Sequence, residues 1–301
     1  MKRAALLVLL AACPHPAGPP KHFDALAPGD HLSDGTAYHV LGTGPTCIAI
    51  SGGPGLDWRY LRSPELEKQL TVVYMEPIGS GASLRLAPGQ TYALARYVDQ
   101  VERLRVVLRL DRLCLIGHSH GGTVAARYAI DHADRVSALV LYSATDRSDK
   151  EFEAAGAKNL ERWKDEAWYA DARAAFDATP KTDAEATALW PRAMKFLFAD
   201  YTAHADDYAR AIVPVSAAPD LAGDKTPVDL RPELAAITAP TLVITAKDDW
   251  CCGEPWSTEL VAGIKGAKLE KFEHSGHMAH LEEPDHFAQA VSDFVRALVQ
   301  R

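Results

Sequence analysis

The chain has 301 residues, of which 48% are hydrophobic and 24% are charged, so its core can be that of one large domain or of a domain with an insertion. The net charge of -8, with no basic cluster among the mixed surface charges, argues against a nucleic-acid-binding protein. This composition excludes a disordered chain but does not indicate a substrate.

The beginning of the chain has the pattern of an export signal. Two basic residues precede an apolar run over 4–12 that is too short to span a bilayer, so we expect a signal peptide over 1–12. The run ends Leu-Ala-Ala-Cys and resembles the lipobox of bacterial lipoprotein signals. This resemblance implies that Cys13 is lipidated and that the protein is anchored in the bacterial cell envelope, facing the periplasm or the cell surface. Residues 13–22 would then be a Pro-rich tether, while an ordinary signal or a mis-started reading frame remain alternatives.

The other four cysteines have two kinds of setting. Cys47 and Cys114 lie inside apolar strand-like runs, where we expect buried thiols that pack as small hydrophobic groups. Cys251 and Cys252 are adjacent, and because a disulfide between neighbours is strained, we predict none between them. No spacing among the cysteines is typical of a metal site.

Strand-like and helix-like segments alternate through the first half of the chain. Residues 21–41 predict an antiparallel edge hairpin, because turn sequences separate brief extended segments. The elements that follow are strand 46–50, helix 58–68, strand 70–74, helix 92–109, strand 113–116, helix 123–130 and strand 138–142. This regular alternation predicts a mostly parallel, doubly wound sheet, so we assign residues 23–145 to the first part of an α/β core.

The pattern changes over residues 146–236, which lose strand-like runs and become Ala-rich, charged and helical. We predict a helical cap inserted into the core, because strand patterns resume at 241–245 and 268–272. A helix over 284–299, begun by proline, closes the second part of the core at 237–301. A cap in this place would lie over the carboxyl ends of the strands, where open α/β sheets bind ligands.

A Gly-x-Ser-x-Gly pattern lies between the strand ending near residue 116 and the helix that follows. Glycines at 117 and 121 relieve crowding where the chain reverses, so this nucleophile elbow would hold the Ser119 hydroxyl above the sheet. The simpler alternative is a turn serine that caps the helix. The pattern indicates a nucleophile only if a base, an acid and an oxyanion site exist elsewhere.

Candidates for the acid and the base follow two later strands. Asp248 and Asp249 come after strand 241–245, and a group of histidines, His274, His277 and His280, comes after strand 268–272. The order serine, acid, histidine is that of a hydrolase triad. In such a triad the imidazole takes the serine proton, and the carboxylate fixes its tautomer and stabilises its charged form. Taken singly, each group is also explained by a solvated turn or a surface loop.

Two backbone N–H groups are needed to stabilise the anion of the tetrahedral intermediate. The N–H after the nucleophile, on His120, is one candidate. The loop Ser-Gly-Gly-Pro-Gly at 51–55 has almost no side chains, so its backbone can approach a ligand closely and supply the other. Because Pro54 has no N–H, the donor is Gly53 or one of its neighbours.

These motifs together resemble α/β-hydrolases of the proline iminopeptidase type. The similar segments are 51–55, 72–83, 117–122, 272–277 and 281–284, and the resemblance covers the core from about residue 37 onward. It implies the α/β-hydrolase fold with an inserted cap. Position by position, it implies Ser119 as nucleophile, Asp249 as acid, His277 as base and Gly53 with His120 as oxyanion donors.

The resemblance also decides between neighbouring candidates. Asp249 is preferred over Asp248 because the family's acid stands immediately before the residue that matches Trp250. His277 is preferred over His274 by its place after Ser-Gly.

Two departures from the family bear on specificity. Ser51 stands where the family usually has His, and Glu-Pro-Ile at 76–78 stands where it usually has Asp-Gln-Arg. The absence of that arginine removes a charged group near the floor of the active site, so aminopeptidase activity is less strongly expected. The expectation of serine hydrolysis is unchanged. In the family, acidic side chains of the cap hold the substrate's amine, and candidates here include Glu153, Glu161 and Glu166.

We therefore expect a Ser-His-Asp hydrolase that acts on a small-molecule or short-peptide substrate without a cofactor or metal. Removal of an N-terminal residue is the favoured reaction, and hydrolysis of small esters is the alternative. A second alternative is an inactive lipid-anchored binding protein of the same fold, favoured only by the altered loops. A metal-dependent hydrolase using His118, His120 and the histidines of 274–280 is a third, but no acidic bridging ligand has the required spacing.

Overall fold

The computed structural model describes residues 24–299, so the predicted signal peptide, the tether and Cys13 lie outside the described residues. One eight-stranded sheet organises the chain, in the order β1-β2-β4-β3-β5-β6-β7-β8. β1 pairs antiparallel with β2, β2 pairs antiparallel with β4, and the other neighbours are parallel, as predicted. The strands are β1 (Gly29–Ser33), β2 (Thr36–Gly42), β3 (Thr46–Ile50), β4 (Thr71–Met75), β5 (Leu113–His118), β6 (Val136–Tyr142), β7 (Thr241–Ala246) and β8 (Lys268–Phe272).

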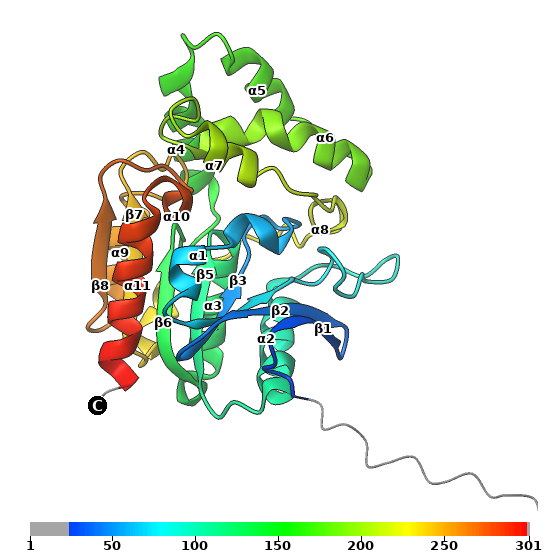
Figure 1. Cartoon of the computed structure of the whole chain (residues 1–301). Coiled ribbons are helices and arrows are strands. Elements are labelled where there is room, and N and C mark those ends of the chain that lie inside the picture. The colour runs from blue at the N-terminus through cyan, green and yellow to red at the C-terminus, as the bar shows by residue number, and fades with distance from the viewer. Residues whose placement is uncertain (1–23, 300–301) are drawn as a thin grey trace, which may run out of the picture.

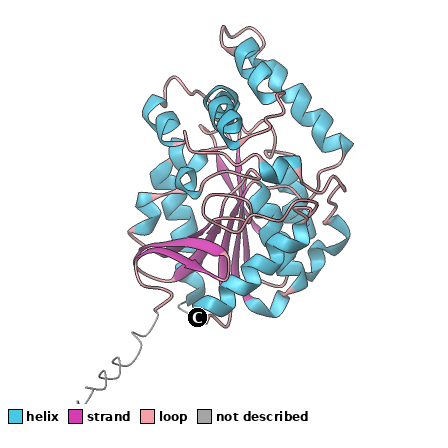
Figure 2. Cartoon of the chain, turned by 90° about the vertical axis from the view of Figure 1, so that its right-hand side faces the viewer, coloured by secondary structure: helices cyan, strands magenta, loops and turns pink. Residues whose placement is uncertain are grey.

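Helices cover both faces of this sheet (Figure 2). One face packs against α2 (Leu94–Leu108), α3 (His120–Asp131) and α9 (Trp256–Gly263). The other packs against α1 (Pro64–Glu67) and α11 (Pro284–Val299). This double cover explains why β5 and β7 are buried along their whole length, whereas β8 at the sheet edge is partly exposed.

The helix predicted over 58–68 is interrupted. The chain forms a 3-10 turn, η1 (Trp58–Leu61), and then the short helix α1, with Ser63 extended between them at φ -125° and ψ 91°. Pro64 causes the break, because its ring disfavours a helical conformation in the preceding residue and it has no N–H for the helix ladder. The prediction of one continuous helix is therefore wrong.

The segment between β6 and β7 forms helices and 3-10 turns, most of which lie above the carboxyl ends of the strands (Figure 1). The last of them packs on the core through Leu234, beside α9. The cap boundaries at 146 and 236 stay a prediction. The elements are α4 (Lys150–Leu160), η3 (Glu161–Trp163), α5 (Tyr169–Phe176), α6 (Asp183–Ala193), η4 (Met194–Leu197), α7 (Ala205–Arg210), α8 (Ala218–Leu221) and η5 (Arg231–Ala236).

An aromatic cluster joins this helical segment to the loop after β7. Trp163 and Phe196 pack in it with Trp250. The Trp250 ring lies 5.3 Å from the ring of Phe176, and its backbone oxygen accepts a hydrogen bond from Asn159 Nδ2 at 2.8 Å. The loop that carries Asp248 and Asp249 is therefore fastened to the helices above it.

Cys47 and Cys114 form a disulfide, which corrects the prediction of two buried thiols. The parallel register of β3 and β5 places Ile48 beside Leu115, so the two cysteines that precede them lie side by side, with Cα atoms 4.5 Å apart. Their burial is as predicted, but the register that pairs them cannot be read from either strand alone. Cys251 and Cys252 are free thiols.

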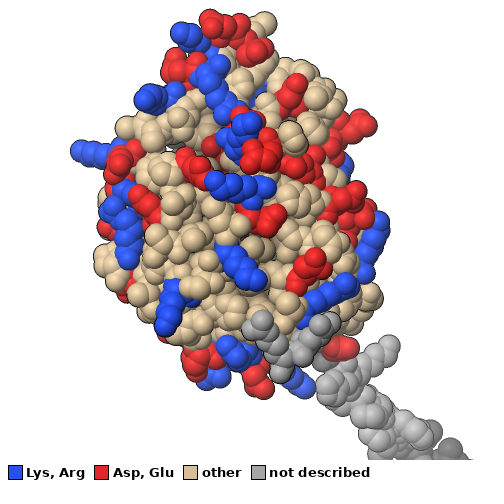
Figure 3. Space-filling view, turned by 90° about the vertical axis from the view of Figure 1, so that its left-hand side faces the viewer, with Lys and Arg blue, Asp and Glu red and all other residues tan. Residues whose placement is uncertain are grey.

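The surface carries charges of both signs. On the β8 side of the molecule, basic and acidic side chains lie close together in the upper half, and further charged side chains of both signs are scattered over the lower half (Figure 3). From residue 24 to residue 299, no helix has both the length and the apolar character required to span a bilayer.

Candidate active site

Ser119 lies at the turn between β5 and α3 in a strained backbone conformation, with φ 54° and ψ -124°. Its N–H donates to the Tyr142 carbonyl at 3.0 Å, and its own carbonyl accepts from Gly122 at 2.8 Å. A Cβ at Gly117 would lie 2.4 Å from the Gly121 oxygen, and one at Gly121 would lie 2.3 Å from the Ile50 oxygen. The glycines are therefore required by the close passage of this turn over β3.

The loop after β3 brings a second backbone N–H to the site. The Gly52 N–H is used internally, since it donates to the Tyr60 hydroxyl at 2.6 Å. No acceptor within the described residues takes the Gly53 N–H, and Gly53 has φ +121°, a conformation that favours glycine. His120 is the first residue of α3, whose N–H has no acceptor inside the helix. The N–H groups of Gly53 and His120 are thus without an acceptor in the described chain, and their role as oxyanion donors stays a prediction.

Asp249 and His277 form a buried pair, with Asp249 Oδ2 2.9 Å from His277 Nδ1. The other carboxylate oxygen accepts the backbone N–H groups of Cys251 at 3.1 Å and Cys252 at 3.0 Å. Burial opposes the charge on Asp249, but the His277 ring and these hydrogen bonds outweigh it and hold the pKa of the carboxyl below its ordinary value. The group is therefore an anion that orients the imidazole.

The neighbouring candidates face elsewhere. Asp248 is part-exposed and pairs with Arg162 at 3.1 Å. His274 is exposed. The Ser119 hydroxyl makes no hydrogen bond within the described chain, so the structure joins Asp249 to His277 but shows no direct hydrogen bond from Ser119 to the imidazole.

A buried polar network below the site was not predicted from the sequence. The Tyr60 hydroxyl accepts from Gly52 and donates to His118 Nδ1 at 2.7 Å, and His118 Nε2 donates to the His277 carbonyl at 3.0 Å. Burial and the neighbouring histidines lower the pKa of His118 well below its ordinary value, so the ring is neutral. Through Tyr60, His118 thus connects the glycine-rich loop 51–55, the predicted oxyanion loop, to the loop of His277. The only feature of the sequence that could have indicated this role of His118 is its position immediately before Ser119.

This network also bears on the metal-dependent alternative. Both nitrogens of His118 are engaged by Tyr60 and by the His277 carbonyl. His120 packs edge-on against Tyr97 at 5.0 Å, and burial lowers its pKa to about 4. The histidines proposed as metal ligands therefore do not converge. In the described part of the chain, the residues that could hold a metal are Cys251, Cys252 and His277.

A cavity of about 560 Å³ opens in front of Ser119. Gly53 and His120 line it beside the serine, and its other walls combine aromatic, aliphatic, proline and hydroxyl side chains with charged groups of both signs, the basic ones being Arg127, Arg147 and Lys225. Glu153, Glu161 and Glu166 do not line it, so the predicted amine-binding candidates lie elsewhere. The acidic residues that do line it are Asp220, in α8, and Asp224, in the loop that follows.

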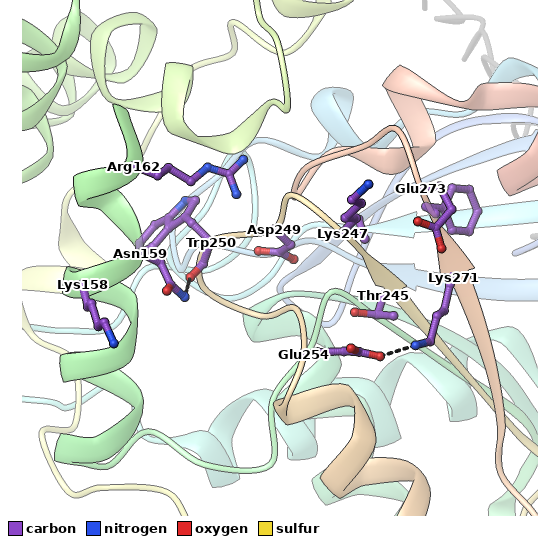
Figure 4. Close-up of a pocket in the computed structure, with 12 residues that line it drawn as sticks. Lys158, Asn159, Arg162, Thr245, Lys247, Asp249, Trp250, Glu254, Lys271 and Glu273 are labelled. Carbon is purple, nitrogen blue, oxygen red and sulfur yellow. Dashed lines mark hydrogen bonds and ion pairs between the residues drawn. The ribbon is translucent and has the colours of Figure 1, made fainter. Parts of the chain in front are cut away.

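A second cavity, of about 570 Å³, lies on the other side of the acid (Figure 4). Asp249 points into it between Trp250 and Lys247, and the Lys271–Glu254 ion pair closes its floor. Neither Ser119 nor the oxyanion loop lines this space. A reaction at Ser119 therefore takes its substrate from the first cavity.

The chain is similar to known proteins over most of its length. The model of the alpha/beta hydrolase fold family matches residues 48–284. A proline iminopeptidase of Heyndrickxia coagulans is 25% identical over 272 residues, 85% of this chain and 92% of that protein. A putative carbamate hydrolase of Variovorax paradoxus is 30% identical over 285 residues, 92% and 96% of the two chains. The structure of an alpha/beta fold family hydrolase from Bacillus anthracis superposes with a TM-score of 0.70 at 20% identity, covering 86% of this chain and 95% of that one.

Proposed function

The chain belongs to the α/β-hydrolase fold family, and we propose that it is a hydrolase that cleaves a small acyl substrate. The reaction would pass through an acyl-enzyme on Ser119. The observation that carries this proposal is the placement of Ser119. It lies in a strained turn, at the wall of a cavity, with the free Gly53 and His120 N–H groups beside it and the Asp249–His277 pair next to its loop.

In the proposed reaction His277 Nε2 takes the proton of Ser119 as its oxygen attacks the carbonyl carbon. Asp249 holds the other ring nitrogen protonated and stabilises the imidazolium. The N–H groups of Gly53 and His120 stabilise the anion of the tetrahedral intermediate. His277 then gives the proton to the leaving group, and a water molecule activated in the same way releases the acyl product. No cofactor enters these steps.

For the substrate, we propose a short peptide or amide with a free N-terminal residue, as in the proline iminopeptidase relatives. Asp220 and Asp224 support this, because they place carboxylates at the wall of the cavity in front of Ser119, where a substrate ammonium group would bind. The aromatic walls from Tyr92 and Tyr97 suit a small apolar side chain or a prolyl ring.

Ester hydrolysis is the second candidate, favoured by one observation. Glu76, in the segment where the family usually has an arginine-bearing sequence, turns to the sheet edge and pairs with His39 at 2.8 Å. The loop therefore brings no cation to the floor of the cavity. The basic side chains that do line the cavity, Arg127, Arg147 and Lys225, come from other elements, so a peptide would not be oriented here as in the family, whereas cleavage of an activated ester does not need that arginine.

The experiment compares turnover of a prolyl arylamide with that of a short-chain aryl ester, with Ser119→Ala as the blank. Arylamide cleavage that disappears when the amine is blocked would support the aminopeptidase. Ester cleavage alone would favour the second candidate. Turnover of either substrate that persists in folded Ser119→Ala would overturn the serine mechanism.

We also propose that the protein is held in the bacterial envelope by lipid on Cys13. The Cys47–Cys114 disulfide supports export, because disulfides persist in oxidising compartments and are rare in the cytosol. Growth with labelled palmitate should label the protein and place it in the membrane fraction, and Cys13→Ser should lose both. Equal labelling of the variant would contradict the anchor.

A further inference from the structure

Two thiols stand against the buried acid–base pair. The sulfur atoms of Cys251 and Cys252 and a ring nitrogen of His277 all lie within 4.8 Å of one another, and this is the one such group of three metal-binding side chains among residues 24–299. Cys251 Sγ is 3.5 Å from His277 Nδ1 and 3.4 Å from Asp249 Oδ1. The proposed reaction uses neither thiol, so their position needs a separate explanation.

The spacing fits a tetrahedral metal ion. With metal–sulfur bonds of about 2.3 Å and metal–nitrogen bonds of about 2.0 Å, the sulfur and nitrogen ligands of a tetrahedral zinc ion lie about 3.5 Å apart. The two distances from Cys251 Sγ already have this length. Cys252 would complete the set by a side-chain rotation, and Asp249 offers an oxygen as the fourth ligand.

We propose that Cys251, Cys252 and His277 Nδ1 form a binding site for a thiophilic cation such as Zn²⁺, and that its occupation switches the hydrolase off. Binding of the cation goes beyond the proposed function, whereas inhibition rests on it. On binding, each thiol loses one proton to solvent and becomes a thiolate ligand. The cation then lies where the Asp249 carboxylate and the Nδ1 proton meet in the free protein.

Inhibition follows from the tautomer of His277. In the free protein the ring holds its proton on Nδ1, towards Asp249, and its Nε2 lone pair is available to Ser119. A cation on Nδ1 moves that proton to Nε2, so the ring no longer accepts the serine proton. Occupation therefore removes the base without moving the backbone.

The cation has a path to this site. Cys252 lines the cavity in front of Ser119, and Asp249 lines the second cavity. Cys251 is partly exposed. A hydrated ion can thus reach the thiols from the substrate side without unfolding the loop.

The first test measures binding without turnover. It uses the full chain carrying Cys13→Ser, to remove the N-terminal thiol, and Ser119→Ala, with thiol titration showing that Cys251 and Cys252 are free. Cd²⁺ should produce a sulfur-to-cadmium charge-transfer band that saturates at one equivalent. Changing either Cys251 or Cys252 to Ser should remove most of the band, and His277→Ala should weaken binding by about tenfold or more.

The matched control is His274→Ala, which removes an exposed imidazole from the same loop and should leave the titration unchanged. No band in protein whose two thiols are free would overturn the site. A band that depends on His274 but not on His277 would show surface binding and would overturn it as well.

The second test measures inhibition in the Cys13→Ser protein, with each variant referred to its own rate without metal. Zn²⁺ should abolish turnover, a chelator should restore it, and Cys251→Ser should raise the inhibition constant by about tenfold or more. Equal inhibition of both proteins would overturn the switch. If no substrate is turned over, the proposed function fails, and the cadmium titration still decides whether the site exists.

Discussion

Two adjacent carboxylates, Asp248 and Asp249, have opposite surroundings although they share one short loop. Asp249 is buried, accepts two backbone N–H groups and pairs with His277. Asp248 pairs with Arg162, and both side chains are about one-third exposed. Only the buried carboxylate can hold an imidazole in one tautomer, because the exposed one exchanges its partner for water.

Replacing Asp249 by Asn should lower kcat by about 10,000-fold, since the amide cannot hold the Nδ1–H tautomer of His277 or stabilise its charge. Replacing Asp248 by Asn should lower it by no more than about fivefold, because an exposed ion pair contributes at most about 1 kcal/mol. Steady-state rates on the better of the two test substrates check both. A larger loss in the Asp248 variant would show that the acid is misassigned.

His280 is a second residue whose setting controls its chemistry. It is 1% exposed in α10 (Ala279–Glu282), and its Nε2 donates to the Tyr60 carbonyl at 2.8 Å. Burial lowers its pKa from 6.5 to about 4. Between these values the unfolded chain binds a proton that the folded protein does not, so acid destabilises the fold; the contribution is fully present above pH 6.5 and is lost towards pH 4.

The free energy of unfolding of the wild type should therefore lose about 2 kcal/mol through His280 between pH 7 and pH 5, and His280→Gln should not show this loss. Glu282 and Asp146 act with the opposite sign, because burial raises their pKa values to about 7 and about 6. The difference between wild type and variant isolates the histidine. Parallel pH curves for the two proteins, measured by denaturant unfolding, would contradict the assignment.

At the scale of elements, β3 and α3 approach each other at the nucleophile turn so closely that no side chain fits between them. The oxygens of Ile50 and Ser51 lie 2.3 Å and 2.7 Å from the place of a Cβ on Gly121. By contrast, Gly156 in α4 would place its Cβ 3.1 Å from the edge of the Trp250 ring, which is a side chain and can shift.

Gly121→Ala should therefore destabilise the protein by about 3 kcal/mol, because backbone must move to admit the methyl group. Gly156→Ala should change stability by at most about 1 kcal/mol, since the gain in helix propensity offsets the contact. Thermal unfolding compares the two variants. Equal melting temperatures would show that the turn has room that the structure does not indicate.

The sequence was sufficient for the elements whose signals are local. The Gly-x-Ser-x-Gly turn and Asp249 follow the buried apolar strands β5 and β7, whereas His277 follows the mixed strand β8 and is marked by its order along the chain. The Cys47–Cys114 disulfide depends on the register between strands, and the Tyr60–His118 network depends on which rings meet in the core. Neither the disulfide nor this network produces a periodic pattern within one segment of the sequence, so neither could be predicted from it. Asp220 lines the cavity from α8, a helix of one turn that is too short for a periodic pattern to give its side chains a direction.

At the scale of the whole molecule, one covalent link joins strands that are 67 residues apart in sequence. Cys47 lies in β3, which leads to the oxyanion loop, and Cys114 lies in β5, which leads to the nucleophile turn. The link therefore shortens the loop that the unfolded chain can explore and acts between the two strands that carry the reacting groups.

Replacing both cysteines by Ala should lower the free energy of unfolding by roughly 4 kcal/mol, the entropy expected for closing a loop of this length. Denaturant unfolding with and without reductant measures it: reductant should lower the stability of the wild type towards that of the variant and leave the variant unchanged. A double variant as stable as the oxidised wild type would show that the link contributes nothing to folding.

The position of Trp250 gives the molecule an optical reporter. Its indole ring lies between the helices above the sheet and the loop of Asp249. There it packs against the ring of Phe176 and against Gly156, which has no side chain. Any displacement of those helices on substrate entry changes what surrounds the indole. The part of the fluorescence that is lost in Trp250→Phe therefore reports on the contact between these helices and the loop of Asp249. The time course of that fluorescence during turnover would show whether the helices move once per catalytic cycle or stay in place.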